Sequence, residues 1–136
     1  MGRVISIDYG KKRTGIAATD PLQLIVNGLA SLDTPDVIGF LEDYIGKEEV
    51  SKIIIGYPFF QEVYNQAFKK EIDDFIEGIR KRFSGIPVDL HDESFTSQRA
   101  KSVILAAGVK KKKRRDKKLV DKMSAVIILQ EYLGHI

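Results

Sequence analysis

The chain has 136 residues, of which 43% are hydrophobic and 30% charged, a net charge of +3 and no cysteine. This size and composition predict one globular domain, residues 1–136, with its own hydrophobic core. The lack of cysteine excludes disulfides, thiolate catalysis and cysteine-ligated zinc, and the absence of a membrane-length apolar run or a signal-peptide pattern predicts a cytoplasmic protein without a membrane partner.

The chain opens with a pattern typical of a β-hairpin. Residues 4–8 form an apolar run that ends in Asp8, and a second apolar run, residues 15–18, follows a basic turn. The hairpin presents Asp8 at a strand end, where the adjoining glycines leave space for a metal ion or a phosphate to approach the backbone. The turn holds three cations that are candidate nucleic-acid contacts: Lys11, Lys12 and Arg13.

A third strand and a helix are expected next. Residues 24–32 are largely apolar, and Thr34 then supplies a helix cap with Pro35 at the first helical position. Apolar residues recur at helical spacing from Val37 onwards, and Gly46 ends the predicted helix. A meander of three strands therefore precedes the first helix.

The middle of the chain alternates strands with helices. Residues 51–58 form a continuous β-branched run closed by glycine and proline, which predicts a central strand buried on both faces. An unusually apolar loop, residues 59–64, leads to an amphipathic helix at about 65–83. Residues 88–93 then alternate as a strand that ends in two adjacent acids.

The last third of the sequence contains two helical patterns separated by a basic tract. A helix capped by Thr96 or a neighbouring serine comes first, and a final helix, residues 118–133, is apolar on most of its circumference. Between residues 96 and 120, ten lysines and arginines stand against Asp116 alone, so the rest of the chain is negative and a polyanionic partner is expected on one side. The predicted core positions of the first of these helices are Ala100, Val103, Ile104 and Ala107.

The order of elements is β-β-β-α-β-α-β-α. A meander followed by alternating strands and helices predicts an α/β fold, with a mixed five-stranded sheet and helices on both faces. This is the element order of the ribonuclease-H-like fold.

Acidic side chains fall at three places that such a sheet can bring together. Asp8 ends the first strand, Asp92 and Glu93 end the last one, and Asp121 lies in the first turn of the final helix. Sites form beyond the carboxyl ends of strands, and clustered carboxylates repel one another unless a cation binds them. Oxygen ligands suit Mg²⁺ or Mn²⁺, which activate water for phosphodiester hydrolysis.

Two alternatives to this metal site remain open. Asp121 can serve only as a helix cap, and the strand-end acids can simply lie at the surface. Strand alternation also does not choose between Asp92 and Glu93, because the two side chains point to opposite faces of the sheet.

The basic tract before Asp121 indicates a phosphate-binding surface, with a solvated loop as the alternative. It contains no aromatic residue, so base stacking and strong sequence preference are not expected there. Its cations are Lys110, Lys111, Lys112, Lys113, Arg114, Arg115, Lys117 and Lys118.

Four motifs follow one another along the whole chain. They are Asp8-Tyr9-Gly10-Lys11-Lys12-Arg13-Thr14-Gly15-Ile16-Ala17, Ile55-Gly56-Tyr57-Pro58, Asp92-Glu93-Ser94-Phe95-Thr96-Ser97, and Val120-Asp121-Lys122-Met123-Ser124-Ala125 with Ile128-Leu129-Gln130. Together they resemble the YqgF family of Holliday-junction-resolvase-like proteins, which are also described as nucleases that mature the 5′ end of pre-16S ribosomal RNA.

The resemblance implies a ribonuclease-H-like fold and magnesium-dependent cleavage of nucleic acid. It implies that Asp8, Glu93 and Asp121 are the catalytic, metal-binding acids, and it favours Glu93 over Asp92. Thr96 and Ser97 match the family's hydroxyl pair and are expected to contact nucleic acid.

The sequence departs from the family pattern at two places. Ser94 stands where the family usually has arginine, and residues 59–64 replace a polar, glycine-bearing loop with an apolar one. Two functions are therefore weighed: a metal-dependent endonuclease acting on precursor RNA or branched DNA, and a non-catalytic RNA-binding factor in ribosome assembly or transcription. Actin-like ATP binding would need a second domain. A junction resolvase would need a two-fold dimer, and the sequence leaves monomer and homodimer open.

Overall fold

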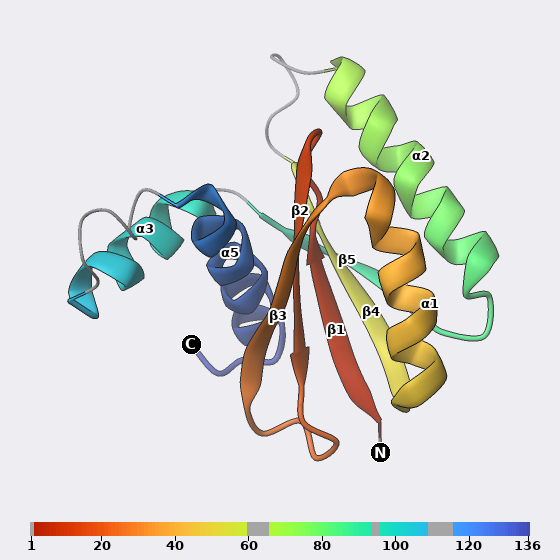
Figure 1. Ribbon diagram of the computed structural model, residues 1–136, viewed down its shortest axis with the longest axis horizontal. Helices are drawn as coiled ribbons and strands as arrows, with labels where there is room; N and C mark the ends of the chain where they lie inside the picture. The colour runs from red at the N-terminus through yellow and green to blue at the C-terminus, as the bar shows by residue number, and fades with distance from the viewer. Residues whose placement is uncertain (1, 60–65, 94–95, 109–115) are drawn as a thin grey trace.

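The computed structural model describes residues 2–59, 66–93, 96–108 and 116–136. Five strands form one mixed sheet in the spatial order β3-β2-β1-β4-β5 (Figure 1). β1 pairs antiparallel with β2 and parallel with β4, β2 pairs antiparallel with β3, and β4 pairs parallel with β5. The strands are β1 (Arg3–Asp8), β2 (Arg13–Thr19), β3 (Val26–Asp33), β4 (Val50–Tyr57) and β5 (Val88–Asp92).

Helices cover both faces of this sheet, as the sequence predicts. Figure 1 shows α1 and α2 on one side, and α3 and α5 on the other. No helix in the described part of the chain is long and apolar enough to cross a membrane. The helical elements are the short 3₁₀ helix η1 (Thr34–Asp36), α1 (Val37–Lys47), α2 (Gln66–Arg82), α3 (Thr96–Ala106) and α5 (Lys117–Tyr132).

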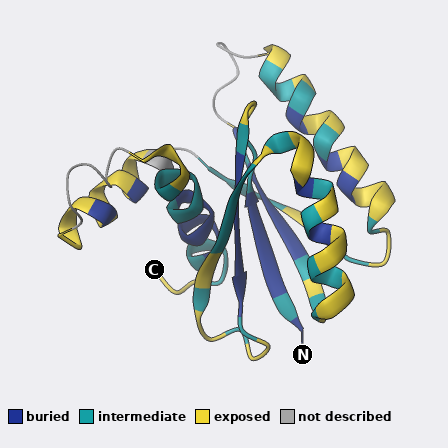
Figure 2. Ribbon diagram, viewed as in Figure 1, coloured by how far each residue is buried: buried dark blue, intermediate teal, exposed yellow. Residues whose placement is uncertain are grey.

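Alternate residues of the central strands build two separate apolar clusters. Ile53 and Ile55 of β4 pack with α1 and α2, whereas Ile54 packs with α5. All three side chains are fully buried, which confirms the prediction that this strand lies in the centre of the sheet (Figure 2). The larger cluster, under α1 and α2, joins Ile5, Ile7, Ile16, Ala18, Val37, Leu41, Ile53, Ile55, Ile72, Ile76 and Ile79.

The third strand starts later than its apolar sequence suggests. It was expected over residues 24–32 but runs from Val26 to Asp33, and Leu24 and Ile25 are more than 60% exposed. Their backbone N–H groups both donate to Asp20 Oδ1 at 2.8 Å. The Asp20 carboxylate thus holds this segment as a turn and overrides the strand propensity of its side chains.

Three details of the predicted helices are wrong. Thr34 does not cap a helix, because the residue before η1 is Asp33, which makes no side-chain capping bond. α1 continues past Gly46 to Lys47. In α3, Ala100 and Ile104 are buried as predicted, but Val103 is exposed, as is Ala107, which lies just beyond the end of the helix. A narrower buried stripe suffices because α3 packs mainly against one partner, α5.

Candidate active site

Asp8 and Glu93 meet at one edge of the sheet. β1, β4 and β5 run parallel, so their carboxyl ends lie together. Asp8 is the last residue of β1, and Glu93 follows β5 directly, with its backbone N–H donating to Tyr57 O at 3.2 Å. The Glu93 carboxylate lies over β4, since a β-carbon added at Gly56 would be 3.1 Å from Glu93 Oε2.

Side-chain alternation places both acids on the face that α5 covers. Ser6 Oγ donates to Ala125 O of α5 at 2.6 Å, so Ser6 and Asp8, two residues further on, share that face. Asp89 of β5 accepts a 2.6 Å bond from Tyr132 Oη of α5, which puts Glu93 on the same face. Asp92 is directed to the other side, so the geometry pairs Asp8 with Glu93.

The paired carboxyls perturb each other. Burial raises the pKa of Asp8 well above its usual range, and the carboxyls of Glu93 and Asp121 raise it further. Burial also raises the pKa of Glu93, although its hydrogen bond with Asp8 acts in the opposite direction. Two carboxylates this close repel each other when both are ionised, so the pair binds either a proton or a cation.

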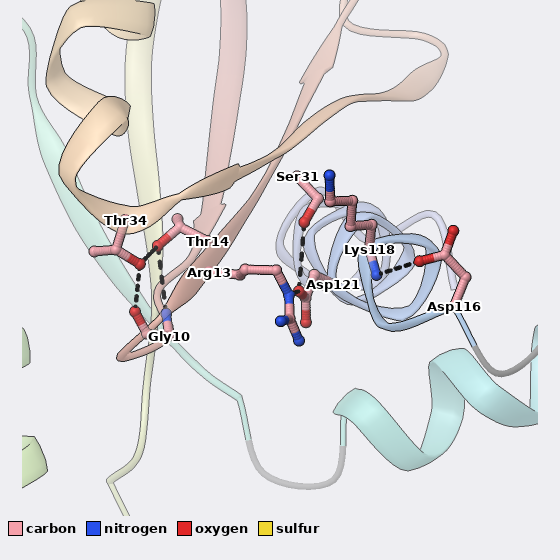
Figure 3. A network of polar contacts seen from close by, with 8 residues as sticks. All are labelled: Gly10, Arg13, Thr14, Ser31, Thr34, Asp116, Lys118 and Asp121. Carbon is pink, nitrogen blue, oxygen red and sulfur yellow. Dashed lines mark hydrogen bonds and ion pairs between the residues drawn. The ribbon is translucent and has the colours of Figure 1, made fainter.

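Asp121 approaches from α5, beside the first hairpin. A β-carbon at Gly15 would lie 2.1 Å from Asp121 O, so glycine is required for α5 to come this close to β2. Arg13 Nε donates to Asp121 Oδ2 at 3.1 Å, and Ser31 Oγ donates to the same oxygen at 3.4 Å (Figure 3). The Arg13 and Asp121 side chains are only 30% and 25% exposed, so water shields this ion pair incompletely.

The capping residue of α5 is Asp116. Its Oδ1 accepts a 2.9 Å hydrogen bond from the Lys118 backbone N–H. The helix begins at Lys117, one residue earlier than expected, and Asp121 lies in its second turn rather than its first. The alternative that Asp121 only caps the helix is therefore wrong.

The three acids occupy one region but do not surround a common point. Among the described residues, no three acidic or histidine side chains are arranged to hold a metal ion as they stand. The Asp121 carboxylate is instead engaged by Arg13 and Ser31. The donor set still suits a hard divalent cation, because it consists of carboxylate oxygens and includes a half-buried pair that a positive charge would stabilise.

The hairpin turn that carries Arg13 is held by the hydroxyl groups of two threonines, Thr14 and Thr34. Thr34 Oγ1 donates to Gly10 O at 2.6 Å and lies 2.9 Å from Thr14 Oγ1 (Figure 3). The Gly10 N–H in turn donates to Thr14 Oγ1 at 3.4 Å. Thr14 and Thr34 are far apart in sequence, and local patterns contain no signal that their hydroxyls meet.

The predicted nucleic-acid contacts lie in several parts of the chain. Lys11 and Lys12 are exposed at the hairpin turn, Arg13 is paired with Asp121, and Lys117 and Lys118 are exposed at the start of α5. Thr96 and Ser97 open α3. The structure does not describe the side-chain positions of Thr96 and Ser97. It also leaves undescribed Ser94, most of the apolar loop at 59–64, and the tract from Lys110 to Arg115.

The fold has a counterpart among solved structures. Thermus thermophilus RuvC, solved in complex with a Holliday junction substrate, superimposes with a TM-score of 0.58 at 15% identity, covering 98% of this chain and 97% of RuvC. The chain thus has the ribonuclease-H-like fold that its element order predicts.

Sequence comparisons define the family to which the chain belongs. A family model described as RuvX, Holliday junction resolvase, matches residues 2–135, and the chain belongs to this family, which confirms the YqgF resemblance. A relative from Bacteroides thetaiotaomicron is 49% identical over 135 residues, covering 98% of this chain and 96% of that protein. Another from Porphyromonas gingivalis is 46% identical, covering 99% and 98%. Both relatives carry the name "Putative pre-16S rRNA nuclease".

Proposed function

We propose that this protein is a metal-dependent endonuclease that hydrolyses phosphodiester bonds, and that its substrate is the precursor of 16S ribosomal RNA at its 5′ end. The observation that carries the proposal is the half-buried Asp8–Glu93 pair at the carboxyl ends of parallel strands, with Asp121 close enough to raise the pKa of Asp8. The names of the full-length relatives support the choice of substrate.

Asp8, Glu93 and Asp121 would hold the metal, which is Mg²⁺ or Mn²⁺ by the chemistry of the oxygen donors. When bound, such an ion lowers the pKa of a water and stabilises the leaving oxygen. The chain itself holds the carboxylates in place. Asp8 lies at the end of β1 and Glu93 directly after β5, and the close packing at Gly15 brings Asp121 to the same region. Arg13, released from Asp121, would be available to a phosphate oxygen of the strand.

The test compares substrates and metals side by side. Labelled pre-16S leader RNA and a four-way DNA junction are incubated with Mg²⁺, Mn²⁺ or a chelator, using the parent protein and Asp8→Asn. We expect metal-dependent cutting of the RNA that falls by more than about 100-fold in the variant, since a metal ligand matters at least as much as the groups that orient one. Equal cutting by Asp8→Asn would refute the assignment, and cutting of the junction alone would change the substrate.

A second candidate function is a non-catalytic RNA-binding factor. It is favoured by the Arg13–Asp121 ion pair, which neutralises one acid without a metal ion. The two functions differ in their response to metal without substrate. A nuclease is stabilised against unfolding by Mg²⁺ or Mn²⁺ through ligand linkage, and this stabilisation disappears in Asp8→Asn. A binding factor shows no such shift and binds RNA in the presence of a chelator.

A further inference from the structure

A pocket of about 290 Å³ lies beside the candidate acids, between β3 and the start of α5. It adjoins the site through Ser31, whose hydroxyl donates to Asp121 (Figure 3). Its lining residues are Ser31, Asp116, Lys118, Leu119 and Lys122.

The two lysines of the pocket share one face of α5 with Asp121. Residues 118, 121 and 122 follow the i, i+3, i+4 spacing, so their side chains are neighbours on the helix surface. Within the described residues, neither Lys118 nor Lys122 forms an ion pair. The pocket therefore offers two cations that form no ion pair within the described residues, although the Asp116 carboxylate also lines it.

β3 holds Lys122 in place. A β-carbon at Gly28 would lie 2.5 Å from Lys122 Cγ and 2.9 Å from Lys122 Cδ, so the lysine stem runs directly over the glycine backbone. A stem packed in this way loses little further conformational freedom when its ammonium group binds an anion. The lysine is thus positioned before any ligand arrives.

The rest of the lining fits a nucleotide better than a simple anion. Leu119 offers an apolar contact for a sugar ring. Asp116 would repel a phosphate, but it accepts hydrogen bonds, and its bond to the Lys118 N–H fixes the carboxylate at the pocket. A ribose 2′-hydroxyl can donate to such an acceptor, and DNA lacks this group.

We propose that this pocket binds a ribonucleotide flanking the scissile bond, with its phosphate on Lys118 and Lys122 and its 2′-hydroxyl donating to Asp116. The proposal rests on the proposed function in one respect, that the ligand is a nucleic acid. It assigns to Asp116 the preference for RNA over DNA.

The lysine part is tested by binding without cleavage. Fluorescence anisotropy measures the affinity of a short single-stranded RNA and of the DNA of the same sequence, in chelator, over a series of salt concentrations. The double variant Lys118→Gln/Lys122→Gln is expected to bind about tenfold more weakly, with a salt slope lower by about 0.7, the value for one neutralised phosphate of a single strand. Lys81→Gln, an exposed lysine of α2 on the other face, serves as the control and is expected to match the parent.

The Asp116 part is tested by Asp116→Ser, because serine also caps helices but lacks the carboxylate. We expect the ratio of RNA to DNA affinity to fall about three- to tenfold, as for the loss of one hydrogen bond. If Asp116 only caps α5, both affinities rise together as the negative charge is removed, and the ratio does not change. Thermal unfolding of each variant checks that the fold is retained.

The outcomes separate this proposal from the proposed function. An unchanged affinity and salt slope in the lysine double variant would overturn the pocket assignment even if the parent cleaves RNA. Weaker binding in that variant, together with no cleavage in any metal, would keep the pocket and refute the nuclease. DNA bound as tightly as RNA by the parent would overturn the 2′-hydroxyl contact.

Discussion

The two faces of the sheet are built from alternate residues of the same strands, yet they bury different chemistry. The face under α1 and α2 is packed with branched aliphatic side chains. Figure 2 shows that the central strands between the two helical layers are largely buried. The face under α5 has a smaller apolar cluster and also buries Ser6 and Ser124, and Ser124 Oγ makes no hydrogen bond within the described residues. The face under α1 and α2 thus buries the larger apolar cluster, and the face under α5 combines a smaller one with polar groups beside the acids.

Neighbouring residues of β4 provide the sharpest test of this division. Ile54 and Ile55 are both fully buried, one under α5 and the other under α1 and α2. Each truncation to alanine is expected to cost about 2–5 kcal/mol in the free energy of unfolding, measured with urea. Only Ile54→Ala should also weaken Mn²⁺ binding, because a cavity there lets α5 and Asp121 shift.

Calorimetric titration with Mn²⁺ measures the metal affinity of both variants, at a temperature where both are fully folded. Ile55→Ala is the control for Ile54→Ala. Equal losses of metal affinity in Ile54→Ala and Ile55→Ala would show that the two faces do not act separately.

The acid pair should make the α5 face sensitive to pH. A carboxyl group whose pKa is raised by folding contributes stability below its unfolded pKa, and this contribution is lost as pH rises through the raised value. The metal-free parent should therefore lose stability as pH rises from the ordinary carboxyl range towards neutrality. Asp8→Asn removes this loss and should melt several degrees higher than the parent at neutral pH.

Asp43→Asn, at an exposed position of α1, is the matched control for Asp8→Asn and should follow the parent curve. If the metal-free parent and Asp8→Asn have the same pH dependence of melting temperature, the surroundings of Asp8 do not disfavour its ionised carboxylate.

Much of the fold was predictable because periodicity reports which residues a sheet or helix buries. The strand at β4 and the amphipathic helix α2 were read almost to their boundaries. The errors arose where a single polar contact outweighs local propensity. The Asp20 carboxylate converts Leu24 and Ile25 into a turn, and Thr34 binds the first hairpin instead of capping a helix.

The candidate site was predictable only as a set of residues. Alternation shows that Asp92 and Glu93 point to opposite faces, but it does not show which face α5 will cover. The Ser6–Ala125 bond supplies that information. The Arg13–Asp121 ion pair joins residues 108 positions apart, and the sequence contains no signal that their charges meet.

That ion pair predicts a smaller effect at the site. Arg13→Gln frees the Asp121 carboxylate, so Mn²⁺ should bind about two- to fivefold more tightly, in keeping with the strength of a partly exposed ion pair. Titration calorimetry measures the affinity. Lys11→Gln removes a nearby exposed charge that has no ion-pair partner among the described residues, and so separates competition at Asp121 from a general change in potential. Weaker binding in Arg13→Gln would mean that Arg13 helps to orient Asp121.

The smallest effects are expected at ion pairs that join helices on each face. Arg82 and Glu42 connect α2 with α1 and are 58% and 40% exposed, so Arg82→Gln should change the free energy of unfolding by less than about 0.5 kcal/mol. Arg99 connects α3 with Glu131 of α5, whose side chain is only 21% exposed and whose Oε1 has no hydrogen-bond partner among the described residues. Arg99→Gln should therefore cost more, about 1 kcal/mol, because it leaves the partly buried Glu131 carboxylate with only His91 Nε2, 4.0 Å away, as a basic neighbour in the part of the chain that the structure describes. Urea unfolding midpoints measure the stability of both variants. If Arg82→Gln costs more free energy of unfolding than Arg99→Gln, the Arg99–Glu131 pair contributes little, and α3 is held to α5 by its apolar contacts.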